Sequence, residues 1–97
     1  MKAYLVLDFA VRDLAGFLPY VRAIPAFIEK HGGRYVVHGA EATVVEGDWA
    51  PERIVILEFP ARGNAEAFLA DPEVQPLFAL RQRTTTSKLV LVDELRT

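Results

Sequence analysis

The sequence predicts an α+β domain, a ferredoxin-like βαββαβ sandwich in which two helices cover one face of a four-stranded sheet. Two observations lead to this prediction: four β-rich runs and two helical segments, and their order along the chain, β-α-β-β-α-β. This order is the split βαβ arrangement, for which we expect the spatial strand order 4-1-3-2. We further expect an antiparallel or mixed sheet in which the first and third strands lie side by side, parallel, in the middle.

Length and composition limit the possible classes of protein. The chain has 97 residues, so we expect one domain over residues 1–97. The net charge is −2 and no basic stripe suggests a nucleic-acid partner. The chain has no cysteine, which excludes disulfides, thiolate metal sites and a cysteine nucleophile. No stretch reads as a signal peptide or membrane span, so we expect a cytoplasmic protein without membrane partners.

The first half of the chain reads as a strand followed by a helix. Residues 3–11 form a β-rich run, and Asp13 is suited to cap the helix that follows. Pro19 and Pro25 lie inside this helical segment and predict a kink, or a helix that begins near Pro19. The double glycine after His31 is expected to end the helix. The apolar positions have helical spacing and form one face: Leu14, Phe17, Leu18, Val21, Ile24 and Ile28.

The second half contains three strands and a second helical segment. Gly39 interrupts the first of these strands, and the chain is extended again after it, as at a β-bulge. Asn64 is suited to cap the helical segment and Asp71 to restart it, and the segment reaches about Arg83. The strands are expected at residues 34–38, 53–59 and 88–94.

Alternation along the strands leaves apolar side chains on both faces of the sheet. On the first strand Leu5, Leu7 and Phe9 oppose Tyr4, Val6 and Asp8. On the third, Val55, Leu57 and Phe59 oppose Ile54, Ile56 and Glu58, and on the last, Leu89 and Leu91 oppose Val90 and Val92. Helices on one side can cover only one of these faces. A hydrophobic share of 52% is also high for so small a domain. We therefore expect a homodimer in which a second copy covers the open sheet face.

Several short motifs resemble those of the DUF1330 family. They are His31-Gly32-Gly33-Arg34-Tyr35, Glu46-Gly47-Asp48-Trp49, Pro51-Glu52-Arg53, Glu58-Phe59-Pro60, and Asp71-Pro72-Glu73 with Gln75. The resemblance covers nearly the whole chain, although Val74 stands where the family commonly has tyrosine. It implies a dimeric α/β barrel of the ferredoxin-like superfamily but no established activity. That superfamily contains cofactor-free monooxygenases, muconolactone-isomerase-like enzymes, haem enzymes and plain ligand binders, so the fold alone selects none of them.

Two carboxylates are the candidate catalytic groups. A parallel register that pairs Tyr4 with Ile54 puts Asp8 beside Glu58 on one face of the sheet. Two neighbouring, partly desolvated carboxyls share a proton, so that one can act as a general acid or base. The alternative interpretation is that each carboxylate forms a structural ion pair, for example with Arg34, or lies in water at the rim.

Four other side chains are candidates for ligand binding: Arg34, Tyr35, His38 and Trp49. Arg34 and Tyr35 could present a guanidinium and a phenol to an anion, unless Tyr35 packs against the sheet. His38 could shuttle a proton, form one side of a metal site with Glu41, or be an exposed histidine. Trp49 could be a lid over a pocket, a plug in the hairpin or a dimer contact.

Two other groups of polar residues have simpler interpretations. His31 is expected to interact with the C-terminus of the first helix. Arg81, Arg83 and Lys88 flank residues 84–87, where a phosphate could bind. A solvated turn is the simpler interpretation, because no glycine-rich cradle precedes a helix there. No nucleotide fingerprint, zinc spacing or nucleophile elbow is found, and we expect neither cofactor nor metal.

Two functions remain open from the sequence. The first is a small cofactor-independent enzyme that acts on a partly apolar metabolite, with Asp8 and Glu58 transferring protons and Arg34 holding an anionic group. The second is a non-catalytic dimeric binding or interaction module, suggested by the lack of a complete catalytic or metal set. The sequence does not decide whether the protein is an enzyme.

Overall fold

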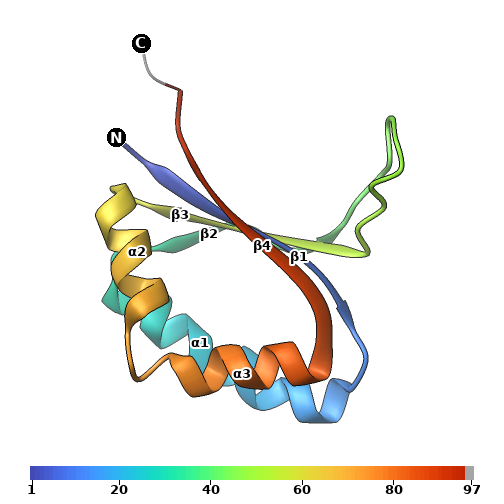
Figure 1. The fold of residues 1–97 in the computed structure, drawn as a ribbon, viewed down its shortest axis with the longest axis horizontal. Helices are drawn as coiled ribbons and strands as arrows, with labels where there is room; N and C mark the ends of the chain where they lie inside the picture. Colours follow the sequence, from blue (N-terminus) through green and yellow to red (C-terminus); the bar gives the residue numbers. More distant parts are fainter. Residues whose placement is uncertain (96–97) are drawn as a thin grey trace.

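The four strands form one sheet, and the helices pack against one of its faces (Figure 1). The computed structural model describes residues 1–95; residues 96 and 97, which the single-domain prediction includes, lie outside the described residues. The elements in chain order are β1 (Ala3–Val11), α1 (Leu14–Lys30), β2 (Arg34–Glu41), β3 (Arg53–Phe59), α2 (Arg62–Ala70), α3 (Gln75–Thr84) and β4 (Thr85–Asp93). The α+β class agrees with the prediction, and the second helical segment consists of two helices, α2 and α3.

The sheet has the strand order β2-β3-β1-β4, and each neighbouring pair is antiparallel. The prediction that the first and third strands run parallel is therefore wrong. The crossover through α1 makes β1 and β2 run in the same direction, and the hairpin at residues 42–52 then reverses β3. Because β3 lies between β2 and β1, it must be antiparallel to both.

Helix α1 is continuous through both prolines. The Asp13 carboxylate accepts a hydrogen bond from the backbone N–H of Gly16 at 3.0 Å, which caps the helix as predicted. The helix begins at Leu14 and not at Pro19. Both Pro19 and Pro25 lie on its exposed side. The helix ends at Lys30 with His31 as its C-cap, and Gly32 follows with φ of +79°.

The α2–α3 region differs in detail from the expected caps. Helix α2 begins after Ala61 without a side-chain cap, and Asn64 instead donates through Nδ2 to the backbone oxygen of His31 at 3.3 Å. The Asp71 carboxylate accepts from the backbone N–H of Glu73 at 3.0 Å and so stabilises the turn between the two helices. Helix α3 then begins at Gln75.

The core lies between the helices and the face of the sheet that they cover. The sheet contributes Leu5, Leu7, Phe9, Leu57 and Phe59, and the helical side contributes Phe17, Tyr20, Ile24, Ile28, Phe68, Val74 and Phe78. The opposite face has no such cover: the Val90 side chain is 55% exposed, and Val36 and Val92 are also exposed. None of the helices within residues 1–95 is long and apolar enough to cross a membrane.

Candidate functional site

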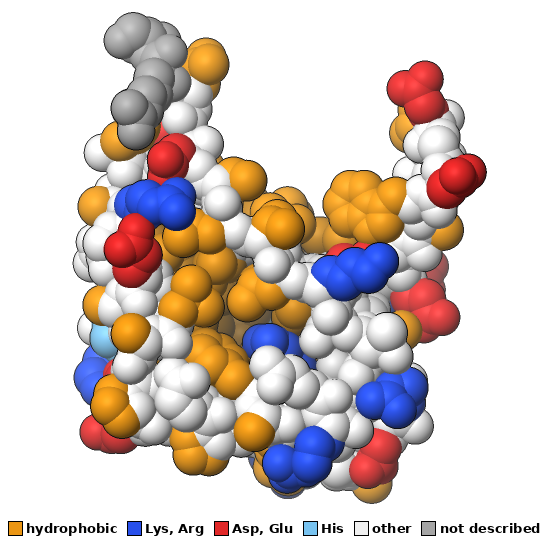
Figure 2. All heavy atoms as spheres, viewed as in Figure 1, with side chains coloured by type: hydrophobic (Ala, Val, Ile, Leu, Met, Phe, Trp, Pro, Cys, Tyr) orange, Lys and Arg blue, Asp and Glu red, His pale blue; other side chains and the backbone are white. Residues whose placement is uncertain are grey.

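A cavity of about 90 Å³ lies inside the core, between the sheet and the helices. Figure 2 shows a hollow between the sheet and the helices, where hydrophobic side chains surround a basic group. Most of the lining side chains are aliphatic or aromatic. Four are polar: Tyr20, Tyr35, His38 and Arg81. An apolar cavity with a few converging polar groups is the usual composition of a small-molecule site.

One irregularity in β2 brings Tyr35 and His38 to the same cavity. Strict alternation would put residues 35 and 38 on opposite faces of the sheet. The pairing with β3 shifts between Tyr35 and Val37 and again between His38 and Ala40. The second shift lies at Gly39, whose φ of +76° glycine adopts easily. The first shift alone puts Tyr35 and His38 on the same face, because it is the one that lies between them. The two rings consequently stack, with centroids 3.8 Å apart.

The Tyr35 phenol is held in its protonated form. Burial, with a smaller contribution from the neighbouring Tyr20, raises the pKa of Tyr35 to about 12. At neutral pH this phenol can therefore donate a hydrogen bond to a ligand but cannot act as a base.

Arg81 is the cationic side chain of the cavity. It is 5% exposed, and its guanidinium lies over the rings of Tyr20 and Phe78, 5.8 and 5.3 Å from their centroids. Its Nη1 donates a long hydrogen bond of 3.5 Å to the Tyr20 hydroxyl. Within residues 1–95, no carboxylate oxygen lies within 4.0 Å of the guanidinium, and its buried Nε has no acceptor.

The sequence interpretation of Arg81 as part of a solvated turn is wrong. Position 81 follows the buried Phe78 by three residues and the buried Val74 by seven, so it lies on the inner face of α3. That periodicity is the signal in the sequence that could have identified this buried arginine.

The expected pairing of Asp8 with Glu58 does not occur. In the antiparallel register Asp8 faces Ile54 and Glu58 faces Tyr4. The two carboxylates share the open face but lie four residues apart along the strands, a separation of roughly 13 Å. They cannot share a proton at that distance, and the error follows directly from the assumed parallel register.

Glu58 is held in an ion-pair cluster on the open face. Arg34 Nε donates to Glu58 Oε2 at 2.7 Å, and Lys2 Nζ lies 3.4 Å from Oε1. The Tyr4 hydroxyl donates to the same Oε1 at 3.3 Å. The hydrogen bond from Arg34 lowers the pKa of Glu58, so this carboxyl keeps its charge at neutral pH. Arg34 is neutralised here and lies on the face opposite the cavity.

Trp49 also lies on the open face, in the loop that joins β2 and β3. Its Nε1 donates to Asp8 Oδ2 at 2.7 Å, which ties the loop to β1. Trp49, Val6, Ile54 and Ile56 line a shallow groove together with residues 42–46. The structure therefore separates the sequence candidates: Tyr35 and His38 meet in the cavity, whereas Arg34, Trp49, Asp8 and Glu58 lie on the other side of the sheet.

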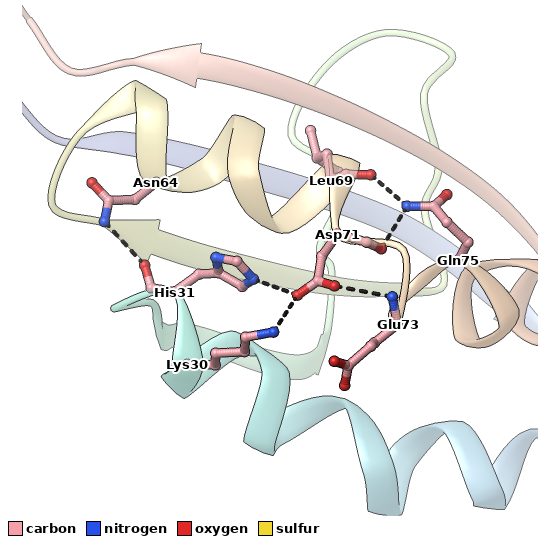
Figure 3. Close-up of polar contacts among 7 residues, drawn as sticks. All are labelled: Lys30, His31, Asn64, Leu69, Asp71, Glu73 and Gln75. Atoms are coloured by element: carbon pink, nitrogen blue, oxygen red, sulfur yellow. Dashed lines mark hydrogen bonds and ion pairs between the residues drawn. The ribbon is translucent and has the colours of Figure 1, made fainter.

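The second buried charge, Asp71, is fully compensated (Figure 3). Its Oδ2 accepts from Lys30 Nζ at 2.9 Å and lies 2.8 Å from His31 Nε2, both at the end of α1. Gln75 donates to the backbone oxygens of Leu69 and Asp71 and so stabilises the same turn between α2 and α3. The hydrogen bonds from Lys30 and His31 hold the pKa of Asp71 well below its usual range. This network connects α1 to the α2–α3 turn and is structural.

No metal centre is formed by the part of the chain that the structure describes. No group of three or more histidine, cysteine, aspartate and glutamate side chains is arranged to hold an ion among residues 1–95. His38 and Glu41 thus have no third ligand there.

Comparisons with solved structures show the fold. The RPA0582 protein of unknown function from Rhodopseudomonas palustris aligns with a TM-score of 0.78 at 18% identity, over 99% of this chain and 84% of that one. SnoaB from Streptomyces nogalater, a cofactor-independent oxygenase, aligns with a TM-score of 0.68 at 21% identity, over 99% and 95% of the two chains. A dimeric protein of unknown function and ferredoxin-like fold from Bacteroides fragilis aligns with a TM-score of 0.58 at 15% identity, over 96% of each chain.

Sequence comparison gives the family. No curated protein matches the chain. The sequence model of a domain of unknown function, DUF1330, matches residues 2–95, in agreement with the motifs noted above. The chain belongs to the DUF1330 family.

Proposed function

We propose that this protein binds a small, mostly apolar metabolite in the cavity between sheet and helices and performs acid–base chemistry on it without a cofactor. The observation that carries the proposal is the convergence of Tyr20, Tyr35, His38 and Arg81 on one apolar cavity. The likeness to SnoaB supports it, because a protein of this fold is described as a cofactor-independent oxygenase.

In this proposal the two stacked residues of β2 have different roles. His38 is exposed at the edge of the cavity, and histidine is the side chain best suited to exchange protons near neutral pH. The protonated phenol of Tyr35 donates a hydrogen bond to an oxygen on which negative charge develops. The apolar walls limit water around the reacting group and strengthen both interactions.

A deuterium-exchange assay tests this function without a known substrate. A panel of small enolisable ketones, diketones and keto acids is incubated with the protein in D₂O, and loss of the α-proton signal is followed by NMR. We expect accelerated exchange for at least one compound, lowered about 100-fold or more by His38→Gln and about tenfold or more by Tyr35→Phe.

The Asp8→Asn variant is the matched control, because Asp8 lies on the opposite face of the sheet. Exchange should be unchanged in this variant. If Asp8→Asn abolishes exchange while His38→Gln does not, the site is on the open face. If no compound exchanges faster than in buffer, the protein is better described as the non-catalytic binding module.

We also propose that two copies pair through their open sheet faces. The central row of that face, Val90, Val6 and Ile56, is apolar and has no helix over it. The chain exposes 6147 Å², whereas a monomer of its mass typically exposes about 5,500 Å². This excess approaches the roughly 800 Å² that one partner buries in a standard interface. The Bacteroides fragilis protein of similar fold is described as dimeric.

Light scattering on a sizing column tests the dimer. The wild-type protein should elute with twice the mass of the chain at micromolar concentration, and Val90→Lys should elute as a monomer, because a lysine there would be buried against the partner. Leu14→Lys is the control, since Leu14 is an equally exposed apolar residue on α1. A dimer that survives Val90→Lys but not Leu14→Lys would move the interface to the helices.

A further inference from the structure

We infer that the ligand of the cavity is an anion, a small apolar carboxylate whose acid group pairs with Arg81. This inference rests on the proposed binding role of the cavity and specifies the class of ligand that enters it. It assigns to Arg81 the anion-holding role that sequence analysis gave to Arg34, which Glu58 already neutralises.

Charge balance is the first argument. The guanidinium of arginine stays protonated in proteins, and an isolated buried ion is strongly unfavourable. Three exposed arginines have carboxylate partners: Arg34 pairs with Glu58, Arg53 with Glu41, and Arg62 with Glu66. Arg81 is buried more deeply than these, yet within residues 1–95 it has no such partner. An anionic ligand would supply the missing charge.

The donors around the cavity are the second argument. A guanidinium carries five N–H donors in a planar fork that matches a carboxylate. Among the described residues, Arg81 uses one of them, in the 3.5 Å contact with the Tyr20 hydroxyl. The Tyr20 hydroxyl accepts in that contact and can donate its own proton to an anion. Tyr35 is protonated and adds another donor at the same cavity.

The size of the cavity limits the rest of the ligand. An engineered cavity of about 150 Å³ holds benzene, so the 90 Å³ here suits a short aliphatic chain or part of one ring. With the carboxylate on Arg81, the remainder of the molecule reaches toward His38 and Tyr35 in β2. The ligand would therefore present its apolar body, and any reactive carbon, to the proposed acid–base residue.

Matched pairs of acids and neutral amides test the inference. Butyrate with butyramide and isovalerate with isovaleramide differ mainly in charge, and their binding can be followed in ¹H–¹⁵N NMR spectra at constant ionic strength. The Nε–H signal of Arg81 is a direct reporter, because this nitrogen has no acceptor in the structure. We expect at least one acid to shift this signal and the cavity residues saturably, and to bind about tenfold or more tightly than its amide.

Substitutions identify the group that makes this distinction. Arg81→Gln should remove the preference for the acid, and Arg81→Lys should retain only part of it, because an ammonium lacks the planar fork. Arg83→Gln is the matched control: it removes the same charge from an exposed position in the same helix and should leave the preference unchanged. The dispersion of each spectrum shows whether the variant is folded.

Three results would overturn the inference, and they differ in what they leave intact. If acid and amide bind the cavity equally, the anion inference is wrong and the cavity remains a binding site. If Arg81→Gln keeps the preference for the acid, a group other than Arg81 binds the carboxylate. If neither class of compound shifts any cavity residue, both the inference and the proposed binding function fail.

Discussion

Two charged side chains are buried in the described part of the molecule, and they differ in how well their charge is compensated by neighbouring groups. Asp71, 7% exposed, accepts from two basic side chains and a backbone N–H. Arg81 has aromatic rings and a tyrosine hydroxyl around it. Desolvation of Asp71 is offset by its partners, whereas that of Arg81 is offset only in part. This difference marks Asp71 as structural and Arg81 as functional.

Replacement of Arg81 should therefore not harm the folded state. We expect Arg81→Met to leave the free energy of unfolding unchanged or to raise it by up to about 2 kcal/mol, because it removes an uncompensated buried cation and fills similar volume. Chemical denaturation of the ligand-free protein measures this, with Arg83→Met as the exposed control. A loss of stability larger than about 2 kcal/mol would show that Arg81 is instead a structural anchor.

At the scale of elements, the shape of β2 decides which side chains meet. An unbroken strand would send Tyr35 and His38 to opposite faces, and the register shift between Tyr35 and Val37 brings both rings to the helix side. The second shift follows His38 and lies at Gly39, which has a positive φ. A Cβ at Gly39 would contact nothing within 4 Å. Glycine is therefore favoured at this position by its backbone conformation and not by a lack of space.

Gly39→Ala should consequently destabilise the protein by about 1–2 kcal/mol, the cost of the left-handed conformation for a residue with a Cβ. Gly63→Ala is the control: it lies in α2, a Cβ there also contacts nothing, and alanine should stabilise that helix by about 0.5–1 kcal/mol. Denaturant unfolding compares the two variants. Equal effects of both substitutions would contradict the conformational argument.

The contact between α1 and the α2–α3 turn depends on the charge of Asp71. Its carboxylate connects the end of α1 to the turn between α2 and α3, and its pKa is lowered by Lys30 and His31. The stabilisation is present above the unfolded-state pKa of about 3.9 and is lost as the pH falls through the lower folded-state value.

We expect Asp71→Asn to lower Tm by roughly 5–10 °C at neutral pH, because the amide cannot replace the charge opposite Lys30 and His31. The Tm difference between wild type and variant should be constant above about pH 5 and shrink below about pH 4. Thermal unfolding between pH 2.5 and 7 measures it. Glu73→Gln, in the same turn, should show neither effect; a Tm difference for Asp71→Asn that is independent of pH would contradict a role for its charge.

At the scale of the whole molecule, the sheet has one covered face and one open face. The helices and the cavity occupy the first, and apolar side chains and the Trp49 loop occupy the second (Figures 1 and 2). If pairing covers the open face, the folded dimer is favoured over the unfolded monomers by mass action.

Stability should then depend on protein concentration. We expect Tm to rise by several degrees between about 1 and 100 μM for the wild type and to stay constant for Val90→Lys. Trp49, the only tryptophan and 60% exposed in the single chain, supplies a second readout. Its emission should shift to the blue as the wild-type protein is concentrated. If neither Tm nor the tryptophan emission depends on protein concentration, the protein is monomeric over this range.

The fold class and the family were readable from the sequence because both depend on local patterns. Alternation and helical spacing predicted four strands and the helices, and the motifs from His31 to Pro60 identified the family. The direction of β3 relative to β1 was predicted wrongly, although the chain order contains it: a crossover followed by a hairpin leaves no other choice.

By itself the sequence determined the strands and the helical segments, because alternation and helical spacing are local patterns. Tertiary structure alone decided the candidate site. Separation of Asp8 from Glu58 depends on strand register, stacking of Tyr35 on His38 depends on the irregularity between them, and the isolation of Arg81 depends on which side chains from other elements surround it. Each depends on how one element pairs or packs with another. The buried charge of Arg81 becomes significant only when the surrounding packing shows that it lacks a carboxylate partner.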